Sequence, residues 1–159
     1  MPSGQTGFNK RAIIKQRQKS DSVGVPQMEI NEITYAINGA VFEVNNILGP
    51  GFLEKVYENA LLIELKNRGL KAESQVPITV SYKGEVVGEY AADLLVEDEV
   101  IIELKTVENL DRAHEAQLLN YLKATGLHVG LLVNFKHKKA DIKRMVLDLP
   151  ERREGLEGN

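Results

Sequence analysis

The spacing of the apolar residues changes near Gly69 from a helical to a strand pattern, and this change limits the folds open to the chain. Over residues 29–48 and 52–67, apolar residues recur at intervals of three and four, which predicts two amphipathic helices. Gly49-Pro50-Gly51 ends the first helix, because Pro cannot continue the helical hydrogen-bond ladder. The inward side of the second helix is expected to carry Leu53, Val56, Tyr57, Ala60, Leu61 and Leu65.

Beyond Gly69, β-branched residues dominate and predict strands with one helix among them. The turn Tyr82-Lys83-Gly84-Glu85 separates two such runs, which is typical of a β-hairpin. Strands are predicted over 70–82, 85–96, 100–107, 127–135 and 141–149. A helix is predicted over 112–124, with an N-cap offered by Asn109-Leu110-Asp111. The order ααβββαββ describes an α/β fold, a mixed β-sheet flanked by helices.

Charge divides the chain into a basic tail and an acidic body. Residues 1–28 have a formal charge of +4, and residues 29–159 have a formal charge of −7. The length of 159 residues suits one domain, which we expect over 29–150, with a flexible tail over 1–28 and a frayed C-terminus over 151–159. The tail either binds nucleic acid through its charge or is a solvated extension without function, and we favour the second interpretation.

Composition excludes several classes of protein. The chain has no Cys, so it has no disulfide, no thiolate nucleophile and no Cys-ligated zinc or iron–sulfur cluster. No apolar run approaches the roughly 20 residues that span a bilayer. The N-terminus also lacks the apolar segment of a secretory signal. We therefore expect a cytoplasmic protein that does not enter a membrane.

The segment 100–107 has charged residues in a strand that is otherwise apolar. Side chains alternate along a strand, so Glu103 and Lys105 share one face, with apolar neighbours on both faces. Asp93 interrupts the preceding strand, and the short turn between the two strands would bring it opposite Glu103. Two carboxylates about 4 Å apart repel by about 4 kcal/mol at an effective dielectric constant of about 20. A proton, Lys105 or a divalent cation must offset that repulsion.

Two carboxylates and a lysine around a cation could hydrolyse a phosphodiester. Mg²⁺ prefers carboxylate oxygens and keeps several water ligands, and a lysine beside it can position or deprotonate the attacking water. An acid-x-Lys triplet occurs three times, also as Glu64-Leu65-Lys66 and Asp141-Ile142-Lys143, but only the one at Glu103 has a strand context and a partner acid. An ordinary cross-strand ion pair explains the same residues equally well.

The stretch LGPGFLEKVY at residues 48–57 resembles the signature of the GxxExxY protein family, small bacterial and archaeal proteins of the PD-(D/E)XK nuclease-like superfamily. The resemblance continues in order through Gln75 and residues 82–84, 92–94, 102–105, 116–122 and 130–135. It implies a PD-(D/E)XK core in which Asp93 and Glu103 bind Mg²⁺ or Mn²⁺ and Lys105 serves catalysis. Glu54, the acid of the signature, would be a third metal ligand.

The resemblance also draws attention to neighbours of Glu54. Tyr57 and Glu58 share a helix face with it. We expect Tyr57 to pack in the core with its hydroxyl toward the site, and Glu58 to be a solvated helix charge. Gln75, in the first hairpin strand, is expected to cap the backbone locally. Asn45 stands where many members of the family have His, which bears only on a role for that position.

The helix that follows the lysine strand carries a polar stripe. His114, Gln117 and Tyr121 fall on one face of it. By the resemblance, Gln117 would contact a substrate phosphate or position water, as an auxiliary catalytic group. His114 is either a proton carrier or simply solvated, and we favour the second. Tyr121 is a further auxiliary candidate.

Basic residues near the C-terminus offer a nucleic-acid contact. Within nine positions lie Lys136, Lys138, Lys139, Lys143 and Arg144. They either form a phosphate-contacting patch or belong to a solvated edge strand that resists aggregation. The leading hypothesis is a Mg²⁺-dependent nuclease acting on DNA or RNA. The alternative is a non-catalytic module that keeps the fold and binds nucleic acid or protein, and a protein partner or homodimer stays open.

Overall fold

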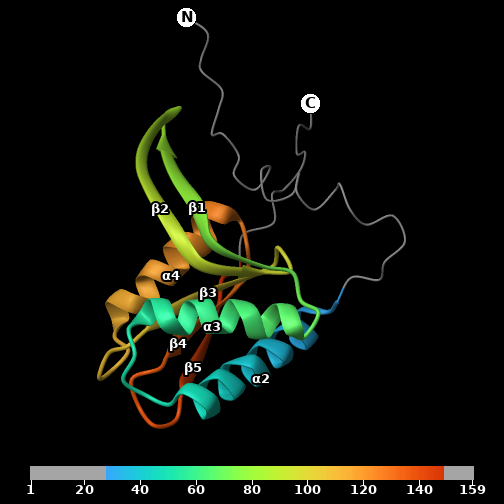
Figure 1. Cartoon of the computed structure of the whole chain (residues 1–159). Helices are drawn as coiled ribbons and strands as arrows, with labels where there is room; N and C mark the ends of the chain where they lie inside the picture. The colour runs from blue at the N-terminus through green and yellow to red at the C-terminus, as the bar shows by residue number, and fades with distance from the viewer. Residues whose placement is uncertain (1–27, 149–159) are drawn as a thin grey trace, which may run out of the picture.

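The structure is a computed structural model that describes residues 28–148 (Figure 1). The predicted basic tail, except for its last residue, and the predicted frayed C-terminus lie outside the described residues. None of the described helices is long and apolar enough to cross a membrane.

Three helices and five strands make up the described part of the chain. The helices are α2 (Ile30–Leu48), α3 (Glu54–Asn67) and α4 (Arg112–Thr125). The strands are β1 (Ala72–Tyr82), β2 (Glu85–Val96), β3 (Val100–Lys105), β4 (Val129–Asn134) and β5 (Asp141–Val146). Their order along the chain confirms the predicted ααβββαββ arrangement.

The strands form one mixed sheet in the order β1-β2-β3-β4-β5. Neighbours are antiparallel except β3 and β4, which are parallel and joined by α4. The helices α2 and α3 lie on one face of the sheet and α4 covers the other (Figure 1). In β3, Ile102 and Leu104 pack with α2 and α3, whereas Ile101 packs with α4. This strand is therefore covered on both sides, as its sequence predicted.

The start of α3 differs from the prediction. The helix begins at Glu54 rather than at residue 52, and its N-cap residue Leu53 has extended backbone angles and is 80% exposed. Leu53 therefore does not join the inward stripe, and Val56 is also exposed. Glu58, expected to be solvated, is instead buried, because it lies on the same stripe as Leu61 and Leu65.

Tyr57 packs in the core, as expected, but its hydroxyl does not point to the site. The ring is fully buried and stacks on Phe135, with ring centroids 4.4 Å apart. The hydroxyl donates to the carbonyl oxygen of Gly49 at 2.6 Å and accepts from the backbone N–H of Phe52 at 3.2 Å. The tyrosine of the signature stretch thus fastens the loop between α2 and α3 to the core.

Replacing Tyr57 by Phe is expected to lower the free energy of unfolding by about 1–3 kcal/mol, since two loop groups lose a partly buried partner while the ring stays. Urea denaturation measures this change. The matched control is Tyr35→Phe, because Tyr35 is 82% exposed on α2 and should leave the midpoint unchanged. Equal midpoints for both variants would contradict the role of the Tyr57 hydroxyl.

The sheet forks at Asp93. β1 and β2 pair over almost their whole lengths, but β2 pairs with β3 only through Leu94, Leu95 and Val96. Before Asp93 the two hairpin strands leave the sheet and rise from the body as a two-stranded ribbon that ends at Tyr82-Lys83-Gly84-Glu85 (Figure 1). The fork is the point at which backbone groups of β2 and β3 lose their ladder partners.

Candidate active site

Asp93 and Glu103 face each other at the fork. Continuing the register that pairs Leu94 with Ile102 would place these two residues opposite one another. Where the two strands diverge, their side chains accept hydrogen bonds from backbone N–H groups in place of the strand pairing. Glu103 Oε1 accepts from the N–H of Asp93 at 3.1 Å. Asp93 Oδ2 accepts from the N–H of Leu104 at 2.8 Å. The structure thus brings together the two carboxylates that the sequence singled out.

The environment of this pair disfavours two negative charges. Glu103 is 4% exposed, and Asp93 is partly exposed. Burial, followed by the charge of Asp93, raises the pKa of Glu103 to about 8, against the opposing effect of Lys105. At neutral pH the pair therefore retains a proton unless a cation replaces it.

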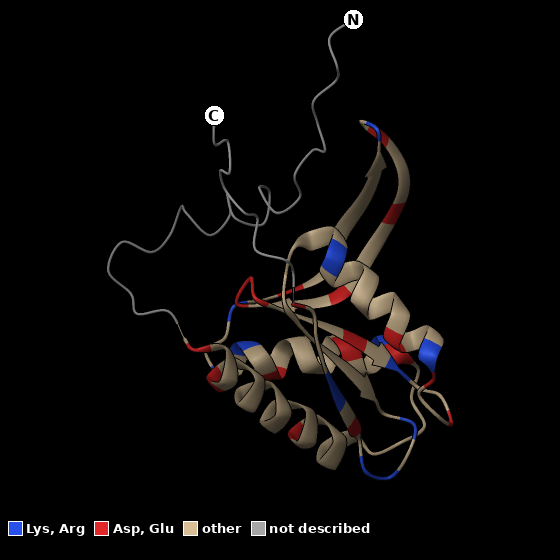
Figure 2. Cartoon of the chain, turned by 180° about the vertical axis from the view of Figure 1, so that it is seen from behind, with Lys and Arg blue, Asp and Glu red and all other residues tan. Residues whose placement is uncertain are grey.

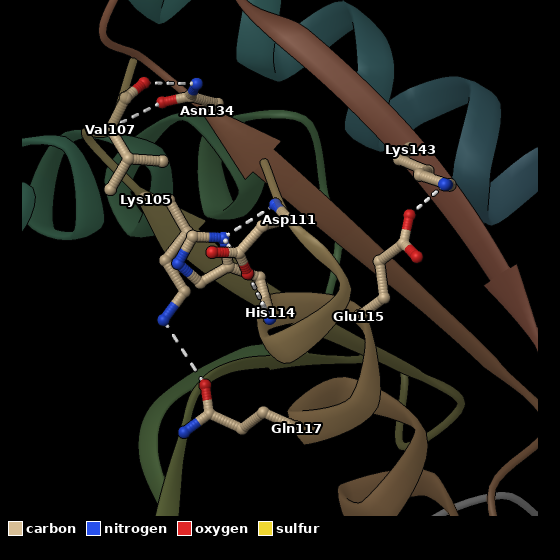
Figure 3. A network of polar contacts seen from close by, with 8 residues as sticks. All are labelled: Lys105, Val107, Asp111, His114, Glu115, Gln117, Asn134 and Lys143. Carbon is tan, nitrogen blue, oxygen red and sulfur yellow. Dashed lines mark hydrogen bonds and ion pairs between the residues drawn. The ribbon is translucent and has the colours of Figure 1, made fainter. Parts of the chain in front are cut away.

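Lys105 follows Glu103 by two residues on the same face of β3. Its Nζ donates to Oε1 of Gln117 in α4 at 3.2 Å (Figure 3). Gln117, predicted as an auxiliary group, thus contacts the lysine and can hold the ammonium in place. Among residues 28–148, no partner accepts from the amide nitrogen of Gln117.

Tyr121 lies one helical turn beyond Gln117 and therefore over Glu103. The helix α4 connects the parallel strands β3 and β4 and therefore runs in the direction opposite to β3. One turn of α4 rises about 5.4 Å, which is close to the length of about 6.6 Å that two residues of β3 span. A step from Gln117 to Tyr121 therefore corresponds to a step from Lys105 back to Glu103. The pKa of Tyr121 is raised by burial and then by the charges of Glu103 and Asp93, which agrees with this placement. Tyr121 thus lies on the α4 side, near the carboxylate pair.

His114 caps α4. Its backbone N–H donates to Asp111 Oδ1, and its Nδ1 accepts from the N–H of Asp111, each at 3.0 Å (Figure 3). The hydrogen bond from His114, with a smaller effect of Lys105, lowers the pKa of Asp111. The structure gives His114 a structural role that neither sequence interpretation had foreseen, whereas the N-cap at Asp111 is confirmed.

Glu54 does not join the carboxylate pair. It is exposed in the first turn of α3, and among residues 28–148 no group of three or more His, Asp or Glu side chains is arranged to hold a metal ion. The expected site of three carboxylates is therefore not formed by the described residues. The physical reason is the direction of α3, which turns Glu58 rather than Glu54 inward.

The buried Glu58 is hydrogen-bonded to the exposed Gln75, a pair that the sequence interpretation did not include. Gln75 Nε2 donates to Glu58 Oε1, and Lys55 Nζ lies 2.6 Å from Glu58 Oε2. Gln75 has a φ of 52°, a strained value for a residue with a side chain. At this position, opposite Asp93, the pairing between β1 and β2 is interrupted. Gln75 therefore contacts α3 and does not cap the backbone. The spacing of Glu58 to Leu61 and Leu65 was a signal for its burial.

Asn134 is a second residue that the sequence did not single out. Its side chain is buried, donates to the carbonyl oxygen of Val107 at 2.7 Å, and accepts from the N–H of Val107 at 3.1 Å (Figure 3). The same oxygen accepts from the N–H of Lys136 at 3.2 Å. Asn134 also pairs with Lys105 in the β3–β4 register, so it fastens the chain just beyond the lysine. Its only signal was a polar residue in an apolar run.

The five basic residues do not form one patch. Lys143 contacts Glu115 of α4 (Figure 3), whereas Arg144 donates to Asn31 Oδ1 of α2 at 3.0 Å. Successive side chains of β5 point to opposite faces of the sheet, which separates the two. The remaining Lys136, Lys138 and Lys139 are exposed in the loop after β4, among the blue segments of Figure 2. That loop follows the carboxyl end of β4, next to the end of β3 that carries Lys105.

The carboxylate pair fits a hard divalent cation, although only two side chains contribute to it. Mg²⁺ in proteins is commonly bound through one or two carboxylates and completes its shell with water and substrate oxygens. Asp93 and Glu103 would hold such an ion. The proton that the pair otherwise retains marks the position where positive charge is needed.

Comparisons with known proteins bear on the family and the fold of the chain. A family model described as the PD-(D/E)XK nuclease superfamily matches residues 31–145. The crystal structure of SSO0001 is similar over 94% of this chain and 81% of that one, with 18% identity and a TM-score of 0.50, which bears on the fold alone. A search of curated proteins found no match. Because the family model covers most of the chain, the chain belongs to the PD-(D/E)XK nuclease superfamily.

Proposed function

We propose that this protein is a nuclease that hydrolyses nucleic-acid phosphodiesters with Mg²⁺ or Mn²⁺, and that within the superfamily it is a GxxExxY protein. One observation carries the proposal: two carboxylates meet at the sheet fork, and a lysine lies on the same strand face two residues away. Superfamily membership supports a nuclease-like fold for this site.

The roles of the residues follow from their positions. Asp93 and Glu103 would bind the cation, which when bound supplies positive charge next to a phosphate and acidifies a water. Lys105 would hold the attacking water and balance the charge that develops on the phosphate oxygens. Gln117 would fix the ammonium of Lys105 through the hydrogen bond between them. The backbone N–H groups of Asp93 and Leu104 keep the two carboxylates oriented.

A second function has an observation of its own in its favour. The two carboxylates already satisfy strand N–H groups at the fork, which is a structural role that needs no metal. In that case the protein would be a non-catalytic module that binds nucleic acid or protein through the same fold.

A cleavage assay separates the two functions. Labelled single-stranded DNA, duplex DNA and RNA are incubated with the full chain in Mg²⁺, Mn²⁺ or EDTA, next to Asp93→Asn. We expect cleavage by the wild type that depends on metal, and loss of cleavage in Asp93→Asn. Cleavage that survives in EDTA or is equal in the variant would contradict the metal-dependent nuclease. Binding without any cleavage would favour the second function.

A further inference from the structure

A tyrosine at the base of the ribbon is not used by the proposed chemistry. Tyr90 of β2 is 51% exposed, and its ring centroid lies 5.7 Å from that of Tyr121, with the rings tilted by 48°. Tyr121 in turn lies over Glu103, on the α4 side of the carboxylate pair. Through Tyr121, the exposed ring of Tyr90 is therefore adjacent to the proposed site.

The ring of Tyr90 lies close to Gly88 on the ribbon. A Cβ atom at Gly88 would lie 3.1 Å from Tyr90 Cε2, which is tighter than usual, and 3.6 Å from its hydroxyl oxygen, which is an ordinary contact. A larger residue at this position would therefore require the ring of Tyr90 to shift slightly. About half of Tyr90 stays open to solvent.

The distance along β2 from Tyr90 to Asp93 is short enough for one nucleic-acid strand to contact both Tyr90 and the carboxylate pair. Tyr90 precedes Asp93 by three residues, or about 10 Å of extended strand. Stacked nucleotides repeat at about 3.4 Å along one strand, so this distance corresponds to a few nucleotides. A strand whose phosphate lies at the fork would therefore bring a nearby base to Tyr90.

The side chains of the ribbon are better suited to contact the faces of bases than to bind phosphates. Other exposed apolar or aromatic side chains lie farther along the ribbon, toward its tip: Val80, Tyr82, Val86 and Val87. Lys83 is at the tip, and Glu85 and Glu89 make the ribbon acidic overall, so it does not attract a phosphate backbone. In a duplex the faces of the bases are covered by their neighbours, whereas an unpaired base offers its face to an aromatic ring.

We propose that Tyr90, exposed beside Gly88 and Tyr121, is a stacking platform for an unpaired base, so that the site takes single-stranded nucleic acid or unpaired strand ends. This inference rests on the proposed function, because it names the substrate class of the same site.

Binding measured without metal tests the platform apart from cleavage. The full chain in EDTA is titrated into a fluorescently labelled single-stranded oligonucleotide and into the matching duplex, and anisotropy is recorded. Base–aromatic stacking is strong enough that Tyr90→Ala should weaken single-strand binding by about 5- to 150-fold, and Tyr90→Phe should keep it within about twofold. Duplex binding should be weaker in the wild type and unchanged in the variants. The matched control is Tyr35→Ala, an exposed tyrosine on α2.

Tyrosine fluorescence gives a second readout on the unmodified chain. The sequence has no Trp and five Tyr, so its emission reports tyrosines directly. Single-stranded oligonucleotide should quench it in the wild type and in Tyr35→Ala, but less in Tyr90→Ala. Single-strand binding that is equal in Tyr90→Ala, no preference for single strands, or no quenching would each overturn the platform. Absence of cleavage with these results intact would overturn the nuclease proposal and leave the platform standing.

Discussion

Replacing Lys105 by Ala is expected to lower the rate of metal-dependent cleavage by about 10²- to 10⁴-fold, the range typical of a group that assists proton transfer in the transition state. The ammonium lies on the same strand face as Glu103, and its contact with Gln117 fixes its direction. Truncation removes that charge and leaves the carboxylates and the fold in place. The measurement is the single-turnover rate at saturating Mn²⁺, so that binding does not enter.

Lys66 supplies the matched control. It belongs to Glu64-Leu65-Lys66, the same acid-x-Lys triplet, but is exposed on α3. Lys66→Ala should therefore keep the wild-type rate. A Lys105→Ala variant that cleaves as fast as Lys66→Ala would remove Lys105 from the mechanism and leave the triplet as a cross-strand ion-pair motif.

Replacing Glu103 by Gln is expected to lower Mn²⁺ affinity by about 100-fold or more, since even residues that only support metal ligands change affinity by about 10- to 100-fold. In the wild type the affinity should rise with pH by up to about tenfold per unit until about pH 8, because the ion displaces the proton that Glu103 holds with a pKa of about 8. Isothermal titration calorimetry at several pH values measures both effects.

The same group makes the metal-free protein less stable as pH rises. The pKa of Glu103 is raised from 4.5 to about 8 on folding, so the folded chain holds this proton more tightly than the unfolded chain does. Its contribution to the free energy of unfolding is complete below about pH 4.5 and is lost as pH approaches 8. The melting temperature in EDTA should therefore fall over this interval for the wild type and fall less for Glu103→Gln.

Glu64→Gln is the control for both experiments, because Glu64 pairs with Arg68 on α3, away from the fork. It should match the wild type in Mn²⁺ affinity and in the pH dependence of melting. Mn²⁺ binding to Glu103→Gln with wild-type affinity would contradict a metal held by this carboxylate pair.

Much of the fold could be read from local patterns. The three-and-four spacing of α2, the hairpin turn after Tyr82 and the apolar run of β4 each produce their element in the structure. The start of α3 was predicted less accurately. Leu53 is apolar but precedes the helix, so the helical spacing does not determine where its side chain points. The split of Lys143 from Arg144 was also readable, since alternation along β5 already put them on opposite faces.

The candidate site was predictable in part. Asp93, Glu103 and Lys105 come together because a short turn and the period of two in strands fix which side chains share a face. Gln117 reached Lys105 because α4 must return across β3. The spacing of Glu58 to Leu61 and Leu65 was a signal for its burial, but its hydrogen bond with Gln75, seventeen residues away in another element, was not predictable from local spacing.

The sequence by itself determined the order of the elements, the strand that is buried on both faces, and the acid and lysine that share one of its faces. These features repeat over a few residues, so local periodicity specifies them. Only the tertiary structure decided that the sheet forks at Asp93, that Glu58 meets Gln75, and that Tyr90 lies beside Tyr121. Each of these depends on how whole helices and strands pack, which the spacing within any one segment does not contain.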